Sequence, residues 1–253
     1  MDIAVLIKYV PDTTAKISIS GGRVDESNVS KWSISPFDEY ALEAALGMKE
    51  ANEAKVTAIT CGPSRSEKGL RDAAAVGADA LVHITVEDLM SLDSIMIQGL
   101  LAEAVKQIGA DVVFCGKQAA DTNSGSTGPG VAELIGAACV TNASEISFDG
   151  SGFNVMRPAS NGSERVSVSS PCVIAFDKTK SELRRPNVKG IMMAKKKPIE
   201  SMDSTSLGID VSGSSAQISS QSPPAEKAPG QMFEGSDSVS EVVQKLRNEA
   251  KVL

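Results

Sequence analysis

Residues 112–129 read VVFCGKQAADTNSGSTGP and decide the fold. A short apolar run ends in a long loop of Gly, Ser, Thr, Asn and Asp, and a helix-like segment with Val131 and Leu134 follows. Small residues let a backbone approach a phosphate closely, and free N–H groups at a helix N-terminus attract anions. The same composition also fits an ordinary surface loop. The loop's place at the carboxyl end of a predicted parallel strand favours ligand binding.

The segments before this loop alternate between strand and helix patterns. Strands are predicted at 3–7, 55–60, 80–84 and 112–115, and helices from 36 to 48, 66 to 76 and 93 to 108. Ser35 fits an N-cap, Pro36 fits the first helical position, and Asp38 completes a capping box. Right-handed helical crossovers between these strands predict an α/β fold with a doubly wound, mostly parallel sheet.

The pattern changes after Gly136. Short strand-like runs with hairpin turns at 149–152 and 160–162 predict antiparallel additions to the sheet; the runs are 139–140, 145–148, 153–156, 165–169 and 173–176. Residues 203–235 are rich in Ser, Gly, Pro and Gln and cannot form a core alone. We expect a nucleotide-binding domain over 1–200, and an extended arm with a terminal helix over 201–253. That arm needs a surface to lie on, which is either this domain or a partner subunit.

Composition excludes several classes of protein. A net charge of −7 argues against a nucleic-acid partner, and no apolar run is long enough for a membrane span. Met1 leads directly into a strand, so no signal peptide is expected and a cytoplasmic location is predicted. The four cysteines form no CxxC pair, which favours buried small hydrophobes over a zinc site or a disulfide. His83 is the only histidine and lies in a predicted strand, so no metal site or His-based triad is expected.

Several short segments follow one another in a distinctive order. They are Lys8-Tyr9-Val10-Pro11-Asp12, Ser35-Pro36-Phe37-Asp38-Glu39-Tyr40-Ala41-Leu42-Glu43, Cys61-Gly62-Pro63, Gly116-Lys117-Gln118-Ala119 with Asp121, Thr127-Gly128, and Ile191-Met192 followed by Ala194-Lys195-Lys196-Lys197. In this order and spacing the chain resembles the beta subunit of electron-transfer flavoproteins, over nearly its whole length. The resemblance implies a flavodoxin-like, Rossmann-related sheet of the adenine nucleotide hydrolase type.

The resemblance also implies a function. The family works as an alpha–beta heterodimer that carries electrons through FAD between a dehydrogenase, such as an acyl-CoA type, and another redox acceptor. The alpha subunit holds most of that FAD, and the chemistry belongs to the flavin. The beta subunit is then an electron carrier and not an enzyme. It binds a second nucleotide, which is AMP in simple carriers or another FAD in bifurcating relatives that oxidise NADH.

Carried over by position, the second nucleotide has a defined set of contacts. The implied cofactor-binding residues are Leu6, Ser35, Pro36, Phe37, Asp38, Cys61, Gly116, Lys117, Gln118, Ala119, Asp121, Thr122, Asn123, Ser124, Gly125, Ser126 and Thr127. For Leu6 and Cys61, plain core packing is an equal alternative. Ser35 and Ser126 stand where the family often has Asn and Gln. These shorter side chains leave the choice between AMP and FAD open.

A basic segment carries the implied partner site. The family has a loop before its I-M-x-A-K-K-K motif that partner dehydrogenases recognise. Here Leu183-Arg184-Arg185 replaces the family's P-R-Y, Val188 is the expected apolar anchor, and Arg184, Arg185 and Lys189 are the expected steering charges. On composition alone, a solvated cationic face is the better explanation of the lysine run.

Two other functions are compatible with parts of the sequence. An ATP-using enzyme of the adenine nucleotide hydrolase type needs a PP-loop directly after the first strand. Residues 20–25, Ser-Gly-Gly-Arg-Val-Asp, are close to that motif but too long by one residue and too far along the chain, in a predicted hairpin. The chain also lacks a P-loop motif. A homodimeric nucleotide-binding module of the stress type does not need the long C-terminal arm.

Overall fold

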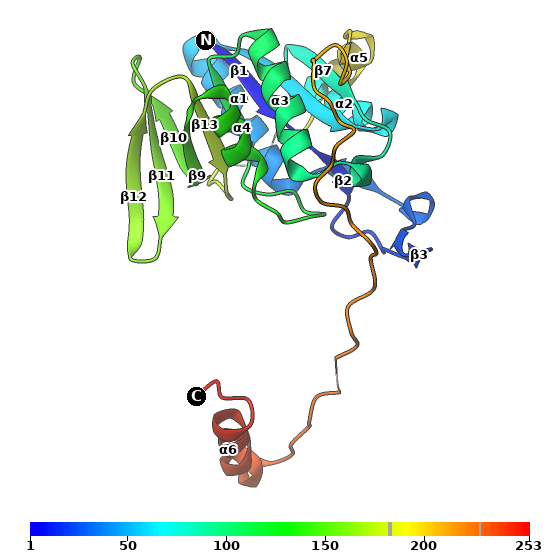
Figure 1. The fold of residues 1–253 in the computed structure, drawn as a ribbon. Helices are drawn as coiled ribbons and strands as arrows, with labels where there is room; N and C mark the ends of the chain where they lie inside the picture. The colour runs from blue at the N-terminus through cyan, green and yellow to red at the C-terminus, as the bar shows by residue number, and fades with distance from the viewer. Residues whose placement is uncertain (182–183, 228) are drawn as a thin grey trace. The chain divides into compact units, whose positions relative to one another are not determined.

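The structure is a computed structural model that describes residues 1–181, 184–227 and 229–253. The chain divides into two compact units, Met1–Gln221 and Ser222–Leu253. The first unit holds the sheets and the candidate site (Figure 1). Each unit is described by itself.

A seven-stranded sheet forms the centre of the first unit (Figure 1). Every pairing in it is parallel, in the order β14-β7-β6-β1-β8-β13-β9. The strands are β1 (Asp2–Leu6), β6 (Lys55–Gly62), β7 (Ala80–Thr85), β8 (Val112–Gly116), β9 (Ala138–Ala143), β13 (Cys172–Phe176) and β14 (Glu200–Met202). The predicted α/β class with a mostly parallel sheet is therefore confirmed.

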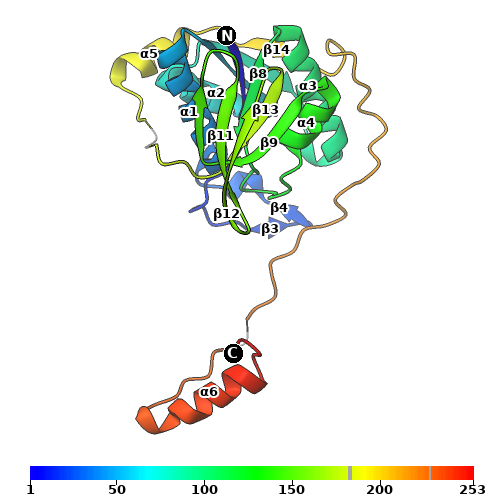
Figure 2. The same cartoon turned by 90° about the vertical axis from the view of Figure 1, so that its left-hand side faces the viewer.

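Helices cover both faces of the sheet, as Figure 2 shows. One core cluster joins the sheet to α1 (Pro36–Asn52) and α2 (Glu67–Val76), and the other joins it to α3 (Ser94–Ile108) and α4 (Thr127–Ile135). Successive side chains of a strand point to opposite faces, so Ile3 and Val5 lie in the first cluster whereas Ala4 and Leu6 lie in the second. Both faces are buried, which is why these strands are almost continuously apolar.

The strand order reverses beside β1. The chain passes from β1 through α1 to β6 on one side, and later through α3 to β8 on the other side. Helices on opposite faces diverge at this switch point, and open α/β sheets bind ligands there, outside the carboxyl ends of the strands. Leu6 and Cys115 are paired at this end of the sheet, so the loop after β8 starts at the switch point.

The prediction that all strands after Gly136 are antiparallel additions was wrong for β9 and β13. Both pair in parallel with the main sheet, and β13 lies between β8 and β9. All five residues of β13 are buried, as expected for a central parallel strand. The hairpins form a separate antiparallel sheet of β10 (Glu145–Phe148), β11 (Phe153–Ala159) and β12 (Gly162–Val168).

Two small antiparallel pairs complete the first unit. One joins β2 (Tyr9–Pro11) to β5 (Trp32–Ile34), and the other joins β3 (Ile19–Ser20) to β4 (Arg23–Val24). Gly21 and Gly22, which connect β3 to β4, have φ angles of 60° and 77°, as a two-residue hairpin turn requires. The hairpin interpretation of residues 20–25 is confirmed.

Residues 200–221 belong to the first unit, although the arm is predicted to begin at residue 201. β14 pairs with β7, and Leu207 is buried in the second core cluster. Farther along, the Gln221 N–H donates to the Gly22 carbonyl at 2.7 Å, and the Gln221 Oε1 accepts from the Val24 N–H at 2.8 Å. This stretch is a strap across the α3 face that ends on the β3–β4 hairpin.

The remaining helices are α5 and α6. α5 (Val188–Lys196) packs on α2, where Gly190 lies against the Ala75 carbonyl and Ala194 is buried. In the second unit, α6 (Val239–Asn248) leaves its apolar side chains Val239, Val243 and Leu246 exposed. Among the helices of the described residues, none has the length and apolar character that crossing a membrane requires.

The cysteines and the histidine follow their predicted environments with one exception. All four thiols are free, and Cys61, Cys115 and Cys172 are buried. Cys139 is exposed, so the expectation of burial was wrong there, because β9 is an edge strand with partly exposed faces. His83 is buried in β7, and its Nε2 lies 2.8 Å from the Gly62 carbonyl oxygen.

Candidate functional site

The candidate site is the loop 117–126, which connects β8 to α4. Asn123 and Gly125 adopt positive φ angles of 52° and 66°, which turn the loop back toward the sheet. Gly128, in the first turn of α4, is buried, and a Cβ there would lie 2.9 Å from the Cys115 Sγ. Because Gly128 has no side chain, the first turn of α4 can pack directly against the end of β8.

The first turn of α4 presents free donors. Ser126 occupies the N-cap position, but its side chain makes no capping hydrogen bond. The Gly130 N–H donates to the Ser126 carbonyl at 2.9 Å, and Pro129 has no N–H. Among the described residues, no hydrogen-bond acceptor meets the N–H groups of Thr127 and Gly128. Small side chains, free amides and the positive end of a helix dipole together fit a phosphate.

The start of α1 holds the other side of the site. The buried Ser35 Oγ accepts from the Ala120 N–H at 3.2 Å, and the Asp38 carboxyl accepts from the Lys8 and Gly116 N–H groups at 2.8 and 2.9 Å. The predicted capping box was wrong, because both side chains bond to the strand ends and the loop instead of to their own helix. The carbonyl oxygen of Ser35 still accepts from the Asp38 N–H at 2.9 Å.

Gly116 permits this arrangement. A Cβ there would lie 2.5 Å from the Asp38 Oδ1 and 2.7 Å from the Phe37 carbonyl carbon. The next residue is held by its own chain, since the Lys117 Nζ lies 2.9 Å from the Asp177 Oδ2 and 4.7 Å from the centre of the Phe37 ring. Lys117 is therefore positioned by two neighbours, with its side chain partly exposed.

The electrostatics of the site centre on Asp38. Burial raises the pKa of its carboxyl to about 7, against the two backbone hydrogen bonds that favour the ionised form. The nearest cation is Lys8, whose Nζ forms a 2.6 Å ion pair with the Asp121 Oδ2 on the loop. Burial also raises the pKa of the Cys61 thiol to about 12, so this cysteine is not a nucleophile.

The structure brings the predicted cofactor residues to one edge of the sheet, where β1, β6 and β8 end. Leu6 and Cys61 are buried in the second core cluster, so their side chains pack and only their backbones border the edge. Within the loop, the Gln118 side chain donates to the Asn123 Oδ1 at 2.9 Å. The exposed loop residues are Asp121, Thr122, Asn123 and Ser124.

Comparison with known proteins identifies the family. The family model described as the electron transfer flavoprotein domain matches residues 24–207. The chain is 33% identical to the electron transfer flavoprotein subunit beta of Bacillus subtilis, over the full length of both chains. The chain belongs to the electron transfer flavoprotein beta-subunit family.

Other relatives agree. The mitochondrial electron transfer flavoprotein subunit beta of Arabidopsis thaliana is 36% identical over the full length of both chains. A protein of Anaerotignum propionicum named acryloyl-CoA reductase electron transfer subunit gamma is 31% identical, over 97% of this chain and 98% of the relative. Members of this family are electron carriers rather than enzymes, and the predicted role in electron transfer is confirmed at that level. The cytoplasmic location stays a prediction.

The partner residues expected from the beta-subunit resemblance differ in their surroundings. Arg184 is paired with α1, with its guanidinium 2.9 Å from Glu43 and 2.6 Å from Glu50. These carboxylates hold the pKa of Arg184 above its usual value. Arg185, Val188 and Lys189 are exposed, and Val188 exposes 76% of its surface. Leu183 lies outside the described residues.

Sequence reasoning missed residues that position this beta-subunit site. Gln98 of α3 is buried, and its Nε2 donates to the Ser126 carbonyl at 3.1 Å while its amide fills the space beside Gly130. The Lys8 side chain anchors the loop to the end of β1 through its ion pair with Asp121. One signal in the sequence could have identified Gln98: it is a polar residue on the apolar face of a predicted helix.

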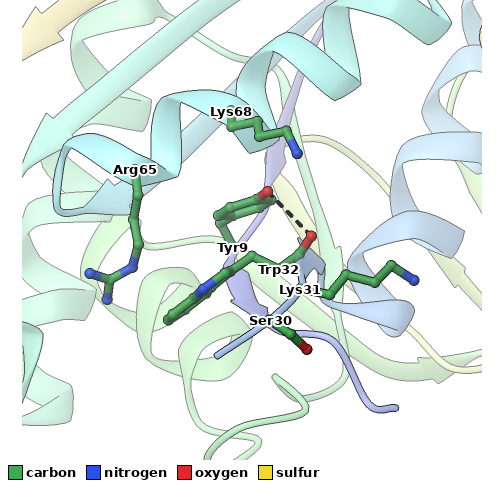
Figure 3. Close-up of a pocket in the computed structure, with 6 residues that line it drawn as sticks. All are labelled: Tyr9, Ser30, Lys31, Trp32, Arg65 and Lys68. Atoms are coloured by element: carbon green, nitrogen blue, oxygen red, sulfur yellow. Dashed lines mark hydrogen bonds between the residues drawn. The ribbon is translucent and has the colours of Figure 1, made fainter. Parts of the chain in front are cut away.

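A hollow of about 400 Å3 lies away from this loop, between β5 and the start of α2 (Figure 3). Its lining residues were not predicted as site residues; they are Tyr9, Ser30, Lys31, Trp32, Arg65 and Lys68. The Arg65 guanidinium lies 4.4 Å from the centre of the Trp32 ring and pairs with Glu26, and Lys31 pairs with Asp12. Two of the three cations are thus neutralised within the chain, and this hollow is a packing junction.

Proposed function

We propose that this chain binds an adenine nucleotide at the switch point, as the beta subunit of a heterodimer that carries electrons through FAD. The observation that supports this most is the pair of free amides at the start of α4, beside a loop of small residues. Both amides lie at the positive end of the helix dipole, where a phosphate is stabilised. The residues present therefore fit the phosphate of AMP or the pyrophosphate of FAD.

Each part of the site has its own task. The free N–H groups of Thr127 and Gly128 bind the phosphate. The exposed Asp121 and Asn123 face solvent beside it and accept or donate to ribose hydroxyls. FAD, when bound between the subunits, takes up and passes on electrons. The residues of this chain bind and orient the nucleotide, and none of them has to act as an acid, a base or a nucleophile.

The partners follow from the exposed surfaces. α6 has an apolar face formed by Val239, Val243 and Leu246 that its own unit leaves uncovered, and we assign it to the alpha subunit. α5 exposes Val188 and Met192 next to Arg185 and Lys189, and we assign this surface to an acyl-CoA-type or other dehydrogenase. Apolar anchors ringed by charges are typical of transient interfaces.

The decisive experiment identifies the nucleotides in the purified heterodimer after denaturation. One FAD and one AMP per heterodimer support a simple carrier, and two FAD support a bifurcating protein. FAD alone, with no second nucleotide, contradicts the proposal. The lone chain is titrated with AMP and with ATP and Mg²⁺ in parallel, and turnover of ATP would favour an ATP-using enzyme instead.

A Thr127→Pro variant tests one of the two amides directly. Proline at N-cap or first-turn positions is compatible with a helix start but removes the Thr127 N–H. Affinity for AMP should fall at least tenfold, with helix content unchanged. A Glu133→Pro variant breaks the same helix in its interior and separates loss of the helix from loss of the donor.

A further inference from the structure

We infer that Asp38 is a positioning residue, which fixes the phosphate loop by joining the ends of β1 and β8 and does not itself touch the nucleotide. This inference rests on the proposed nucleotide site. It differs from the role that the sequence suggests for Asp38, which is a contact to the cofactor.

Both carboxyl oxygens of Asp38 are engaged by backbone donors, and the residue is buried. The Oδ2 accepts from the Lys8 N–H at 2.8 Å and the Oδ1 accepts from the Gly116 N–H at 2.9 Å, and the residue is only 6% exposed. Lys8 follows β1 and Gly116 ends β8, so one carboxyl spans the two strands that border the switch point. The first turn of α1 therefore holds both strand ends through this one side chain.

Neighbouring bonds extend this hold to the loop. The Ser35 N–H donates to the Lys8 carbonyl at 2.9 Å, which fixes the start of α1 on β1. The Ser35 Oγ accepts from Ala120 in the loop, and the Lys8 side chain pairs with Asp121. A change at Asp38 therefore reaches the loop through Lys8 and through Gly116, the residue that precedes the loop.

The charge state of Asp38 decides how many bonds it can accept. An ionised carboxyl accepts a hydrogen bond from both N–H groups. In a protonated carboxyl one oxygen carries a hydrogen, so this oxygen becomes a poor acceptor for the N–H group that faces it. The groups that face it are Lys8 after β1, Asp121 on the loop and the Cys115 thiol on β8. Lys8 favours the ionised form, and Asp121 opposes it. Burial raises the pKa of Asp38 to about 7, so its protonation falls in an accessible pH range.

The first test is AMP affinity against pH for the full-length chain and for Asp38→Asn. With a pKa of about 7, the ionised fraction falls from about 0.91 at pH 8 to about 0.09 at pH 6, and the apparent affinity falls roughly tenfold with it. Asp38→Asn places an amide N–H opposite a backbone N–H, so it binds AMP weakly at both pH values. The titration of the AMP phosphate itself is common to both proteins, so their ratio isolates Asp38.

Glu39→Gln is the matched control. Glu39 lies in the same turn of α1, is half-buried and has a pKa raised mainly by burial, but it makes no hydrogen bond to β1 or β8. The lack of a hydrogen bond from Glu39 to these strands is stated for the residues that the structure describes. This variant should keep the affinity and the pH profile of the unchanged chain. Equal pH profiles for Asp38→Asn and the unchanged chain would overturn the inference.

A readout without nucleotide keeps the inference testable where Asp38→Asn folds poorly. Hydrogen exchange at the Lys8 and Gly116 amides of the unchanged chain, corrected for intrinsic rates, should lose protection at least fivefold between pH 8 and pH 6. Protection at Val5 and Val113 inside the same strands should not change. Constant protection at Lys8 and Gly116 refutes the role of Asp38. If AMP does not bind but the Lys8 and Gly116 amides still lose protection between pH 8 and pH 6, the nucleotide site is refuted and the role of Asp38 stands.

Discussion

Gly116→Ala tests the close approach between β8 and α1. The new Cβ would lie 2.5 Å from the Asp38 Oδ1 and 2.7 Å from the Phe37 carbonyl carbon. A backbone carbon in the first turn of a helix cannot move aside as a flexible side chain does, so α1 and β8 must separate by several tenths of an ångström. That separation stretches the 2.9 Å hydrogen bond from the Gly116 N–H to Asp38.

The magnitude combines two costs. Overpacking of a buried contact costs about 1–3 kcal/mol. Weakening a hydrogen bond to a charged group adds about 1–2 kcal/mol. We expect the free energy of unfolding to fall by roughly 2–5 kcal/mol in total, which lowers the Tm by about 4–20 °C for a chain of this size. AMP affinity should fall as well, because the loop begins immediately after this residue.

Gly47→Ala is the matched control, because it adds the same methyl group where nothing lies within 4 Å. Gly47 is an exposed residue inside α1, so alanine should raise stability by about 0.5–1 kcal/mol. Urea unfolding followed by circular dichroism measures both variants, and the single tryptophan, Trp32, supplies a second probe. A Gly116→Ala protein as stable as the unchanged chain would refute the packing argument.

Four further changes have definite expected outcomes. Phe114→Ala should lower the free energy of unfolding by about 3–5 kcal/mol, because the Phe114 ring is fully buried and its centroid lies 5.0 Å from that of Phe176. Urea unfolding measures this change, and a loss below about 1 kcal/mol would contradict it. Truncation after Gln221 should leave the Tm of the first unit unchanged, whereas truncation after Met202 exposes the Leu207 site and costs about 1.5–3 kcal/mol; equal Tm values for both would show that the strap contributes nothing. A charged thiol reagent should modify only Cys139 in the folded protein and all four cysteines in urea, and Cys139→Ser should abolish the native reaction; rapid native labelling of Cys115 would contradict the described burial. The Met96 N–H lowers the pKa of Asp93 to about 2 from the ordinary 3.8, so its contribution to stability is present above pH 3.8 and is lost as pH falls through 2; Asp93→Asn should flatten the decline of Tm over that range, and an unchanged slope would argue against it.

Local patterns predicted the parts of the fold that local physics controls. The apolar runs of β1 and β8 are typical of parallel strands that are buried on both faces, and Ser35-Pro36 placed the start of α1 correctly. The small-residue loop was found for the same reason, because its composition and its place after a strand are local properties. These elements led to the correct sheet class and to the correct edge of the sheet.

Long-range pairing explains what the sequence reasoning missed. Nothing in the periodicity of β13 says that it pairs with both β8 and β9, since hairpin turns on either side favour antiparallel neighbours. Asp38 and Ser35 match a local capping pattern, yet their acceptors are used by Lys8, Gly116 and Ala120, which are distant in the sequence.

The C-terminal strap could not be recognised in the sequence for a related reason. Its few apolar residues, Leu207, Ile209 and Val211, are too sparse to show a period, but they pack on a helix face that α3 supplies. Arg184 has the composition of a partner-binding residue, and only the structure shows that Glu43 and Glu50 already bind it. Composition measures what a side chain can do, and the fold decides whether it is free to do it.

The position of β13 between β8 and β9 has a consequence for synthesis on the ribosome. β9 leaves the exit tunnel before β13, yet it has no neighbour in the main sheet until β13 arrives. Until β13 emerges, β8 is therefore an open edge of the main sheet and β9 has no partner strand in it. During that interval the emerging polypeptide exposes the apolar strand edge that chaperones recognise.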